Sequence, residues 1–346
     1  MAQPFLTRLK RAGRILLQGD HSTGKRDPIP GISPEEIQEA RQFFPRDKFF
    51  IFGHARSGTT LLARLVRVHP EVHCNYQAHF FTRAPLLQSL VDRPEIESWL
   101  ARRSNRWNHG RDLSPVILRA AADFILEREA LQAGKNIVGD KSPNSLLDGG
   151  AVELMHKVYP DARLIFIVRD GRDTAVSHRF QAFIDSPQHL NTEDLRLRSA
   201  FAEDPQPFKN GSRSVFTEKG IRTAAESWVH NLVDTDRAGR ERYPQSYLSL
   251  RYEDLLRSPL AEMQRVWSFL GASPDLPELA AAVDQEMDSN PDADWQQEKA
   301  NELVSPLEKG THGSWRELFT ARDRSIFKQV AGQTLIDWGY EKDLEW

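Results

Sequence analysis

Short hydrophobic runs recur along the chain and alternate with segments in which hydrophobic residues have a helical spacing. The runs at 48–52, 136–138, 163–168 and 247–250 predict strands, and three of them are apolar enough for a sheet that is covered on both faces. Helical spacing is found between them, in TTLLARLVRVH, GGAVELMHKVYP and AAESWVHNLVDTDRAGRERY. This alternation predicts an α/β fold with a central, mainly parallel sheet flanked by helices.

The two ends of the chain have patterns of their own. Residues 1–32 are basic and amphipathic at first and then rich in Gly, Pro and Ser. Their apolar residues are too interrupted for a signal peptide. We interpret them as an N-terminal arm on the surface, with contact to a membrane surface or a partner as the alternative. Ser33, Pro34 and Glu36 predict a capped helix start, and a helix is predicted from Thr320 on.

We predict a single domain over residues 33–346. Within it, residues 185–220 are polar, contain scattered prolines and have little periodicity. Such an insertion forms either a lid or binding loop, or a solvated excursion. Residues 272–300 are acidic and also loosely patterned.

Composition and charge narrow the class of protein. The chain has 346 residues, 39% of them hydrophobic, and a formal net charge of −3 at pH 7, which argues against a general nucleic-acid binder. Its apolar runs are far shorter than the ~18 residues of a membrane span. The single cysteine, Cys74, excludes an intrachain disulfide and is predicted to be a small buried residue. These features predict a cytoplasmic protein without a stable membrane span; they leave its oligomeric state open.

The segment FFIFGHARSGTT has the spacing of a phosphate-binding loop with one part replaced. Gly53 and Gly58 stand five residues apart and Thr60 stands where the P-loop needs Ser or Thr, but Thr59 occupies the lysine position. A glycine-rich turn between a strand and a helix offers backbone N–H groups and a helix N-terminus to an anion. Arg56, together with the hydroxyls near it, adds further donors.

The missing lysine bears on the reaction. Phosphoryl transfer by P-loop enzymes uses that lysine and a Mg²⁺ held partly by an acidic residue. In RLIFIVRDGRD, Arg169 comes directly after the predicted strand and before Asp170, and a cation there repels Mg²⁺ and attracts a phosphate. A sulfuryl group carries less negative charge than a phosphoryl group, so cations and hydrogen-bond donors can stabilise its transfer without a metal. The loop thus favours a nucleotide donor that is not cleaved with Mg²⁺.

Four segments of the chain resemble the sulfotransferases that use 3′-phosphoadenosine 5′-phosphosulfate (PAPS). They are HARSGTTLLARLVRVHPEV, ARLIFIVRDGRDTAVSH, YLSLRYEDLLRSP and EKGTHGSWRELFT, in that order over residues 48–320. The motif style is closest to the tyrosylprotein, carbohydrate and bacterial members. The resemblance implies the P-loop NTPase-like sulfotransferase fold, PAPS as co-substrate, 3′-phosphoadenosine 5′-phosphate (PAP) as product, and an insertion near 185–220 that covers the acceptor side.

The resemblance also assigns the donor residues. It implies that Arg56, Ser57, Gly58, Thr59 and Thr60 hold the 5′-phosphosulfate, that Arg169 and Ser177 hold the 3′-phosphate, that Tyr252 contacts the adenine or the 3′-phosphate, and that Lys309 and Gly310 close over the 3′-phosphate. Glu308 departs from the arginine of the cytosolic members. The alternative for RDGRDTAVS is an ordinary helix start, capped by Asp170 or Asp173, with Arg169 paired to a surface carboxylate.

The catalytic residues are assigned less directly. In the tyrosylprotein members an acidic residue follows the first helix, but counting from RSGTT places Gln77 there, and an amide is no general base. His79 is our first candidate base and Asp140 the second; His73 and His54 are weaker. Each histidine has a structural alternative.

Lys141 matches the pocket lysine of the family, and with Arg56 it is predicted to stabilise the transferring sulfuryl group. The alternative for Asp140 and Lys141 is a turn with a surface ion pair. Trp228 is predicted to be core, although an aromatic residue beside the adenine is the other interpretation. No H-E-x-x-H or C-x-x-C pattern predicts a metal site.

Three functions stay in competition at this point. The first is PAPS-dependent transfer of a sulfuryl group to a hydroxyl or amine of an unidentified acceptor: a carbohydrate, lipid, protein or small molecule. The second is a P-loop kinase of small molecules, which needs Mg²⁺ and a lysine from another segment, such as Lys141. The third is a nucleotide-binding protein without catalysis, which Gln77 favours because it stands where the family has its base.

Overall fold

The computed structural model describes residues 29–82, 87–102, 104, 106–143, 149–291, 293–299, 301–307 and 312–346. Five parallel strands form one sheet in the order β2–β3–β1–β4–β5. Their bounds are Val72–Tyr76 for β2, Ile137–Lys141 for β3, Asp47–Phe52 for β1, Arg163–Val168 for β4 and Tyr247–Arg251 for β5. The predicted α/β fold with a central parallel sheet is confirmed.

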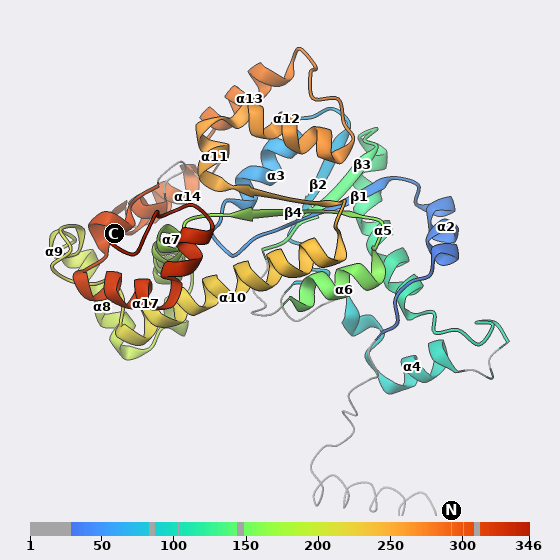
Figure 1. Ribbon diagram of the computed structural model, residues 1–346, viewed down its shortest axis with the longest axis horizontal. Helices are drawn as coiled ribbons and strands as arrows, with labels where there is room; N and C mark the ends of the chain where they lie inside the picture. Colours follow the sequence, from blue (N-terminus) through green and yellow to red (C-terminus); the bar gives the residue numbers. More distant parts are fainter. Residues whose placement is uncertain are drawn as a thin grey trace, which may run out of the picture.

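Helices cover both faces of this sheet (Figure 1). One face packs against α3 (Thr59–Arg67), α11 (Tyr252–Arg257), α12 (Pro259–Leu270) and α13 (Leu279–Asp288). The other face packs against α5 (Ser114–Gln132), α6 (Gly150–Val158), α7 (Gly171–Asp185), α10 (Glu218–Arg242) and α17 (Ala321–Asp337). Alternate residues of β1 point to the two faces: Phe50 and Phe52 into one core, Phe49 and Ile51 into the other.

The predicted strands differ from the observed ones in two places. The predictions for β1, β4 and β5 agree with the structure within one residue. β3, predicted at 136–138, extends to Lys141, so Asp140 and Lys141 lie inside this strand. Both residues are 1% exposed. The surface turn considered for these two residues is therefore wrong. The sequence did not predict β2, one of the two edge strands, in which buried Cys74 lies.

Both predicted terminal helices are present within the described residues. Ser33 caps α2 (Pro34–Phe43) and shares a capping box with Glu36, in which each side chain accepts from the other residue's backbone N–H. Thr320 caps α17 in the same manner with Asp323. The predicted N-terminal arm falls almost wholly outside the described residues.

The insertion at 185–220 contains ordered helices. They are η2 (Pro187–His189), α8 (Thr192–Glu203) and α9 (Gln206–Lys209), anchored by the buried rings of Phe201 and Phe208. Their role toward an acceptor stays a prediction. The remaining elements are η1 (Gln88–Leu90), α4 (Pro94–Ala101), α14 (Ala293–Glu298), α15 (Asn301–Val304), η3 (Ser305–Leu307) and α16 (Trp315–Leu318).

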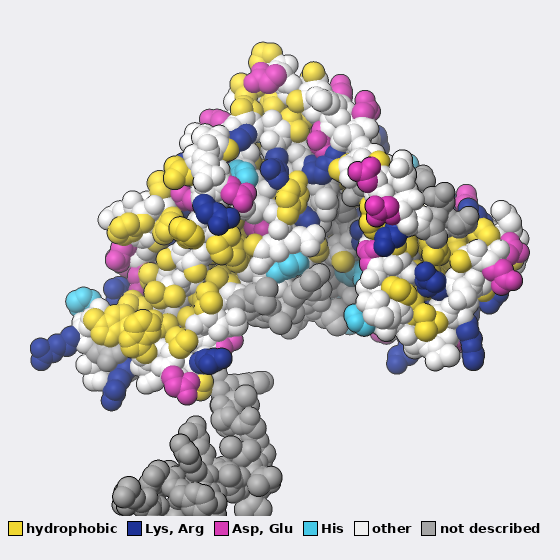
Figure 2. Space-filling view, turned by 180° about the vertical axis from the view of Figure 1, so that it is seen from behind, with side chains coloured by type: hydrophobic (Ala, Val, Ile, Leu, Met, Phe, Trp, Pro, Cys, Tyr) yellow, Lys and Arg dark blue, Asp and Glu magenta, His cyan; other side chains and the backbone are white. Residues whose placement is uncertain are grey.

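Hydrophobic side chains gather on the surface near α4, at the lower left of Figure 2. Trp99 and Trp107 are 58% and 46% exposed, and their ring centroids lie 5.0 Å apart. Among the described residues, no helix combines the length and the apolar character needed to cross a membrane.

Candidate functional site

The loop between β1 and α3 has the geometry of an anion cradle. Arg56 and Gly58 both have left-handed backbone conformations, with φ of 73° and 86°. Gly58 is also required by space, since a Cβ atom there would lie 2.2 Å from the ring of Tyr252. The loop leads into α3, which begins at Thr59 and has no acidic residue in its first turn. The positive end of this helix therefore faces the loop and favours a bound anion.

Two arginines are held against the loop. Arg56 Nε donates to Ser177 Oγ at 3.1 Å, which ties the loop to α7. Arg169, at the end of β4, donates from Nη1 to the carbonyl oxygen of Arg56 at 3.1 Å, and its guanidinium lies 5.0 Å from the ring centroid of Tyr252. Trp228 is 1% exposed, as predicted for core, and its Nε1 donates to the Arg169 carbonyl oxygen at 3.1 Å. The predicted 3′-phosphate residues are thus brought together beside the loop.

A third cation reaches the loop from β3. Lys141 Nζ donates to Thr60 Oγ1 at 3.1 Å and lies 5.4 Å from the ring centroid of Tyr76. Burial lowers the pKa of Lys141, against the opposing influence of Cys74 and Asp140. The strand next to the loop therefore supplies the ammonium that the loop itself lacks at Thr59.

A cavity of about 630 Å³ opens beside the loop, with Arg56 and Arg169 in its wall. Lys141 is absent from the lining and meets the cavity through Thr60, which lines it. The predicted donor residues that line it are Arg56, Gly58, Thr59, Thr60, Arg169, Ser177 and Tyr252. Ser57 does not line it, because its side chain is 1% exposed, and its Oγ has no hydrogen-bond partner among the described residues. Lys309 and Gly310 lie outside the described residues.

The first candidate base is not brought to the cavity. Gln77 lines the cavity, whereas His79 is 6% exposed and is absent from the lining. His79 Nδ1 lies 2.7 Å from Thr82 Oγ1, and its backbone N–H donates to Ser142 Oγ at 2.8 Å. Both Gln77 and His79 have a positive φ, of 57° and 51°. The turn between β2 and the next segment thus points the amide, not the imidazole, at the cavity.

Asp140 fixes this turn by hydrogen bonds. Its Oδ1 accepts from the Ala78 N–H at 3.0 Å and its Oδ2 accepts from Ser142 Oγ at 2.5 Å. Burial raises the pKa of Asp140 to about 6, although these two hydrogen bonds act in the opposite direction. Asp140 is also absent from the cavity lining. Its contacts are those of a residue that fixes the turn carrying Gln77, and its role as a base stays a prediction.

The start of α7 combines parts of both interpretations of RDGRDTAVS. Asp170 caps the helix, as in the structural alternative, but the arginine that pairs with it is Arg172, at 2.6 Å. Asp173 accepts from the Gly313 N–H at 2.6 Å and so holds the segment before α16 against α7. Ser177 is the seventh residue of α7, nearly two turns into the helix rather than the one turn expected.

Several lining residues were not predicted. Gln181 and Asp185 follow Ser177 at intervals of four residues on α7, and this helical repeat is a signal that the sequence contains. Asn290 and Gln296 lie on another wall, where Asn290 Nδ2 donates to Gln296 Oε1 at 2.9 Å. No sequence pattern connects these two amides to the loop.

Metal-binding side chains do not cluster in the described part of the chain. Within those ranges, no group of three or more His, Cys, Asp or Glu residues is placed so that it holds a metal ion.

The fold and the loop define an α/β protein with a cavity at the carboxyl ends of β1, β3 and β4 that is lined by Arg56 and Arg169. The model of the sulfotransferase family matches residues 48–206 of this chain, which confirms the family resemblance predicted from the motifs. Protein-tyrosine sulfotransferase A of Caenorhabditis elegans is 32% identical over 226 residues, which cover 64% of this chain and 49% of that protein. A protein-tyrosine sulfotransferase of Drosophila melanogaster is 33% identical over 129 residues, 37% of this chain and 24% of that protein.

The chain thus spans about half, or less, of the length of these relatives. Among solved structures, mouse sulfotransferase SULT7A1 in complex with PAP aligns with a TM-score of 0.44 and 16% identity, over 89% of this chain and 94% of that one.

Proposed function

We propose that this protein transfers a sulfuryl group from PAPS to a hydroxyl or amine of an acceptor. The observation that carries the proposal is the convergence of Arg56, Arg169 and Lys141 on one loop at a helix N-terminus. Such a set suits a ligand with several anionic groups held apart from one another. The match of residues 48–206 to the sulfotransferase family adds independent support.

The proposed roles follow from the contacts. The α3 N-terminus, with Thr59 and Thr60, holds the 5′-phosphosulfate, and Arg169 with Ser177 holds the 3′-phosphate. The acceptor oxygen or nitrogen forms a bond to sulfur, the bond from sulfur to the bridging oxygen breaks, and PAP leaves. Lys141, beside Thr60, stabilises the negative charge that develops on the bridging oxygen.

The acceptor's proton passes to a base. His79 and Asp140 stay the candidates, and each requires a path to the cavity that bypasses Gln77. Independence from metal ions is part of the proposal, because the strand end that would present a metal-binding acid carries Arg169. The acceptor is not assigned, and a cytoplasmic location stays a prediction.

A small-molecule kinase is the second candidate, and one contact favours it. Lys141 reaches the hydroxyl of Thr60, at the start of α3, from β3 and so supplies the substitute lysine that a kinase here requires. A nucleotide-binding protein without catalysis is the third, supported by Gln77 in the cavity wall. The kinase differs from the sulfotransferase in its need for Mg²⁺, and the protein without catalysis differs in having no turnover.

Calorimetric binding of PAP without Mg²⁺, compared with ADP and ATP, tests the proposal. We expect a preference for PAP that is lost in Arg169→Ala, with a loss of about 10- to 100-fold for one charge-assisted contact. Arg169→Lys is the matched control: it keeps the charge, loses the fork geometry and should bind with intermediate affinity. Equal or tighter binding of ATP that depends on Mg²⁺ would put the kinase first.

A further inference from the structure

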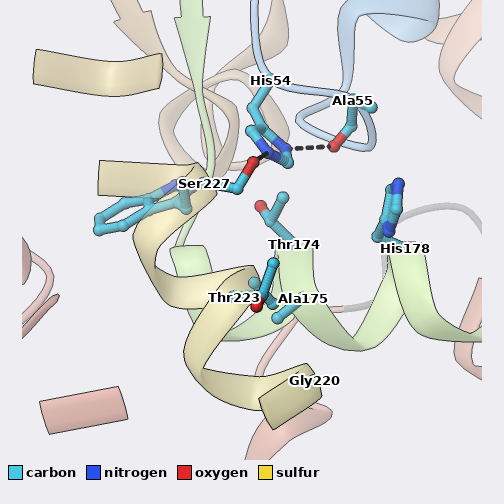
Figure 3. A pocket seen from close by; sticks show the side chains of 10 residues that line it. His54, Ala55, Thr174, Ala175, His178, Gly220, Thr223 and Ser227 are labelled. Carbon is cyan, nitrogen blue, oxygen red and sulfur yellow. Dashed lines mark hydrogen bonds between the residues drawn. The ribbon is translucent and has the colours of Figure 1, made fainter. Parts of the chain in front are cut away.

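A second cavity lies on the other side of the loop from the donor cavity. It measures about 250 Å³ and is enclosed by the loop, the first half of α7 and the first half of α10 (Figure 3). Ala55 is the residue that lines both cavities. None of the roles proposed above uses this second cavity.

His54 is fixed in one tautomer at the wall of this cavity. Its Nδ1 lies 2.9 Å from the Ala55 carbonyl oxygen, which only accepts, so Nδ1 carries the proton (Figure 3). Nε2 then has a lone pair and accepts from Ser227 Oγ at 3.2 Å. Burial lowers the pKa of His54 to about 4, opposed by the hydrogen bond to Ala55 and reinforced by His178. His54 is therefore neutral at physiological pH and presents an acceptor that is already paired with a hydroxyl.

The other polar side chains of the lining are uncharged. Thr174 is one of the residues that line the cavity (Figure 3). It is 1% exposed, and its buried Oγ1 has no hydrogen-bond partner among the described residues. Thr223 adds a third hydroxyl, and burial lowers the pKa of His178 together with the nearby arginines. No Asp, Glu, Lys or Arg side chain is among the described residues that line this cavity.

The buried Thr174 hydroxyl needs a partner that the protein does not supply. A buried hydroxyl without a partner is unfavourable, and a ligand or ordered water that reaches it restores the missing hydrogen bond. The remaining wall, from Ala175, Ala224 and Trp228, is apolar. Hydroxyl groups set against methyl groups and a ring suit a small, neutral molecule that carries hydroxyls, and they disfavour an anion.

We propose that this cavity is a second ligand site, for a small uncharged alcohol or polyol, and that its occupancy is coupled to the donor site. The coupling follows from the chain: Ala55 and His178 line the second cavity, and the next residue of the loop and the preceding residue of α7 are Arg56 and Ser177. Those two are joined by the 3.1 Å hydrogen bond that faces the donor cavity. A ligand that shifts one pair shifts the other. The site itself does not depend on the proposed function; the coupling does.

Glycerol is a suitable probe, with the ring signals of His54 in the ¹⁵N-histidine-labelled full chain as the readout. We expect a saturable shift in the wild type and none in Ala224→Leu, which fills the cavity from α10. Ala281→Leu, an exposed position on α13, is the matched control and should respond as the wild type does. Ser227→Ala and Thr174→Val should each weaken glycerol by about two- to tenfold, the effect of one neutral hydrogen bond.

The same titration with saturating PAP measures the coupling. Glycerol should change the Kd of PAP by the same factor by which PAP changes the Kd of glycerol. Absence of a saturable shift in the wild type, or an equal shift in Ala224→Leu, overturns the site, whatever PAP does. A shift that PAP leaves unchanged, although PAP binds, overturns the coupling. Failure of PAP to bind, with the glycerol shift intact, counts against the donor site and leaves the second site standing.

Discussion

The two ends of the β-sheet hold buried charge in different ways. At the amino end, Lys48 Nζ lies 2.7 Å from Glu127 Oε1 and 3.3 Å from Asp123 Oδ1, and Arg119 lies 2.7 Å from Asp161. Each cation there has carboxylates as neighbours. At the carboxyl end, Arg56 of the loop and Arg169 at the end of β4 line one cavity, and Lys141 of β3 contacts Thr60 in its wall. The paired charges at the first end stabilise the fold, whereas Arg56 and Arg169 at the second end line the cavity that we propose as the site of an anion.

Two carboxylates show the same contrast. Burial acts to raise the pKa of Asp161, but the hydrogen bonds and charges of Arg119 and Arg41 outweigh it, and the net pKa is lowered. Burial also raises the pKa of Asp140, and there the net value remains high, at about 6. Burial acts to raise the pKa of both carboxylates, and the net shifts are opposite because strong cationic partners are present only at Asp161.

Replacing one buried lysine at each end should separate the two kinds of charge most clearly. Lys48 and Lys141 are 2% and 1% exposed. Lys48→Met leaves Glu127 and Asp123 buried without their ammonium and should lower the free energy of unfolding by about 3–5 kcal/mol. Lys141→Met, the matched control, should leave stability unchanged or raise it, because its lowered pKa indicates that burial disfavours its charge. Urea unfolding of both variants checks this, and equal losses would contradict the comparison.

The next largest effect concerns the pH dependence of stability. The pKa of Asp140 is raised from 3.8 to about 6 in the folded protein, so the folded state binds its proton more tightly than the unfolded state does. Its contribution is fully present below pH 4 and is lost as the pH rises through 6, a change of about 3 kcal/mol by linkage. Asp140→Asn removes this pH-dependent contribution to the free energy of unfolding. Urea unfolding between pH 4 and 7 should show the wild type losing stability relative to the variant, and parallel profiles would argue against the raised pKa.

Lys141→Met should also weaken PAP, by about 10- to 100-fold, as expected for the loss of one contact to a charged group. Because the pKa of free Lys141 is lowered and a bound anion raises it, binding above neutral pH should take up a proton. Calorimetry in buffers of different ionisation enthalpy measures that uptake. Retained uptake in Lys141→Met would assign the proton to another group.

β4 is the strand that the sequence shows most clearly, although β5, most of whose residues are only partly buried, is predicted as well. The run at β4 is buried on both faces and stands out from its neighbours. β2 is not predicted because the polar residues His73 and Asn75 interrupt its apolar pattern; its place at an edge is not the reason, since β5 forms the other edge and is predicted. The predicted β3 ends before Asp140 and Lys141, because a hydrophobic pattern does not predict that charged residues are buried in a strand. The element missed in part is thus the one that carries site residues.

The candidate site was predictable where its residues follow the loop or a strand end closely. Arg56, Arg169 and Ser177 are placed by local spacing on adjacent elements of a parallel sheet. Asn290 and Gln296 come from a distant helical segment, and only the tertiary structure brings them to the cavity. His79 was assigned from its residue type, and the positive φ of the turn, which directs Gln77 to the cavity instead, has no signal in the sequence.

The smallest effect concerns the link between the two cavities. Ser177→Ala removes the acceptor of the Arg56 Nε–H bond and the hydroxyl proposed for the 3′-phosphate, and it should weaken PAP by about two- to tenfold. Ser177→Thr keeps the hydroxyl and is the control. If Arg56 only serves the fold, as the paired cations of the amino end do, Ser177→Ala should lower stability and leave PAP affinity unchanged. If Ser177→Ala instead weakens PAP at unchanged stability, and Ser177→Thr restores the affinity, the cations at the carboxyl end serve ligand binding and not the fold.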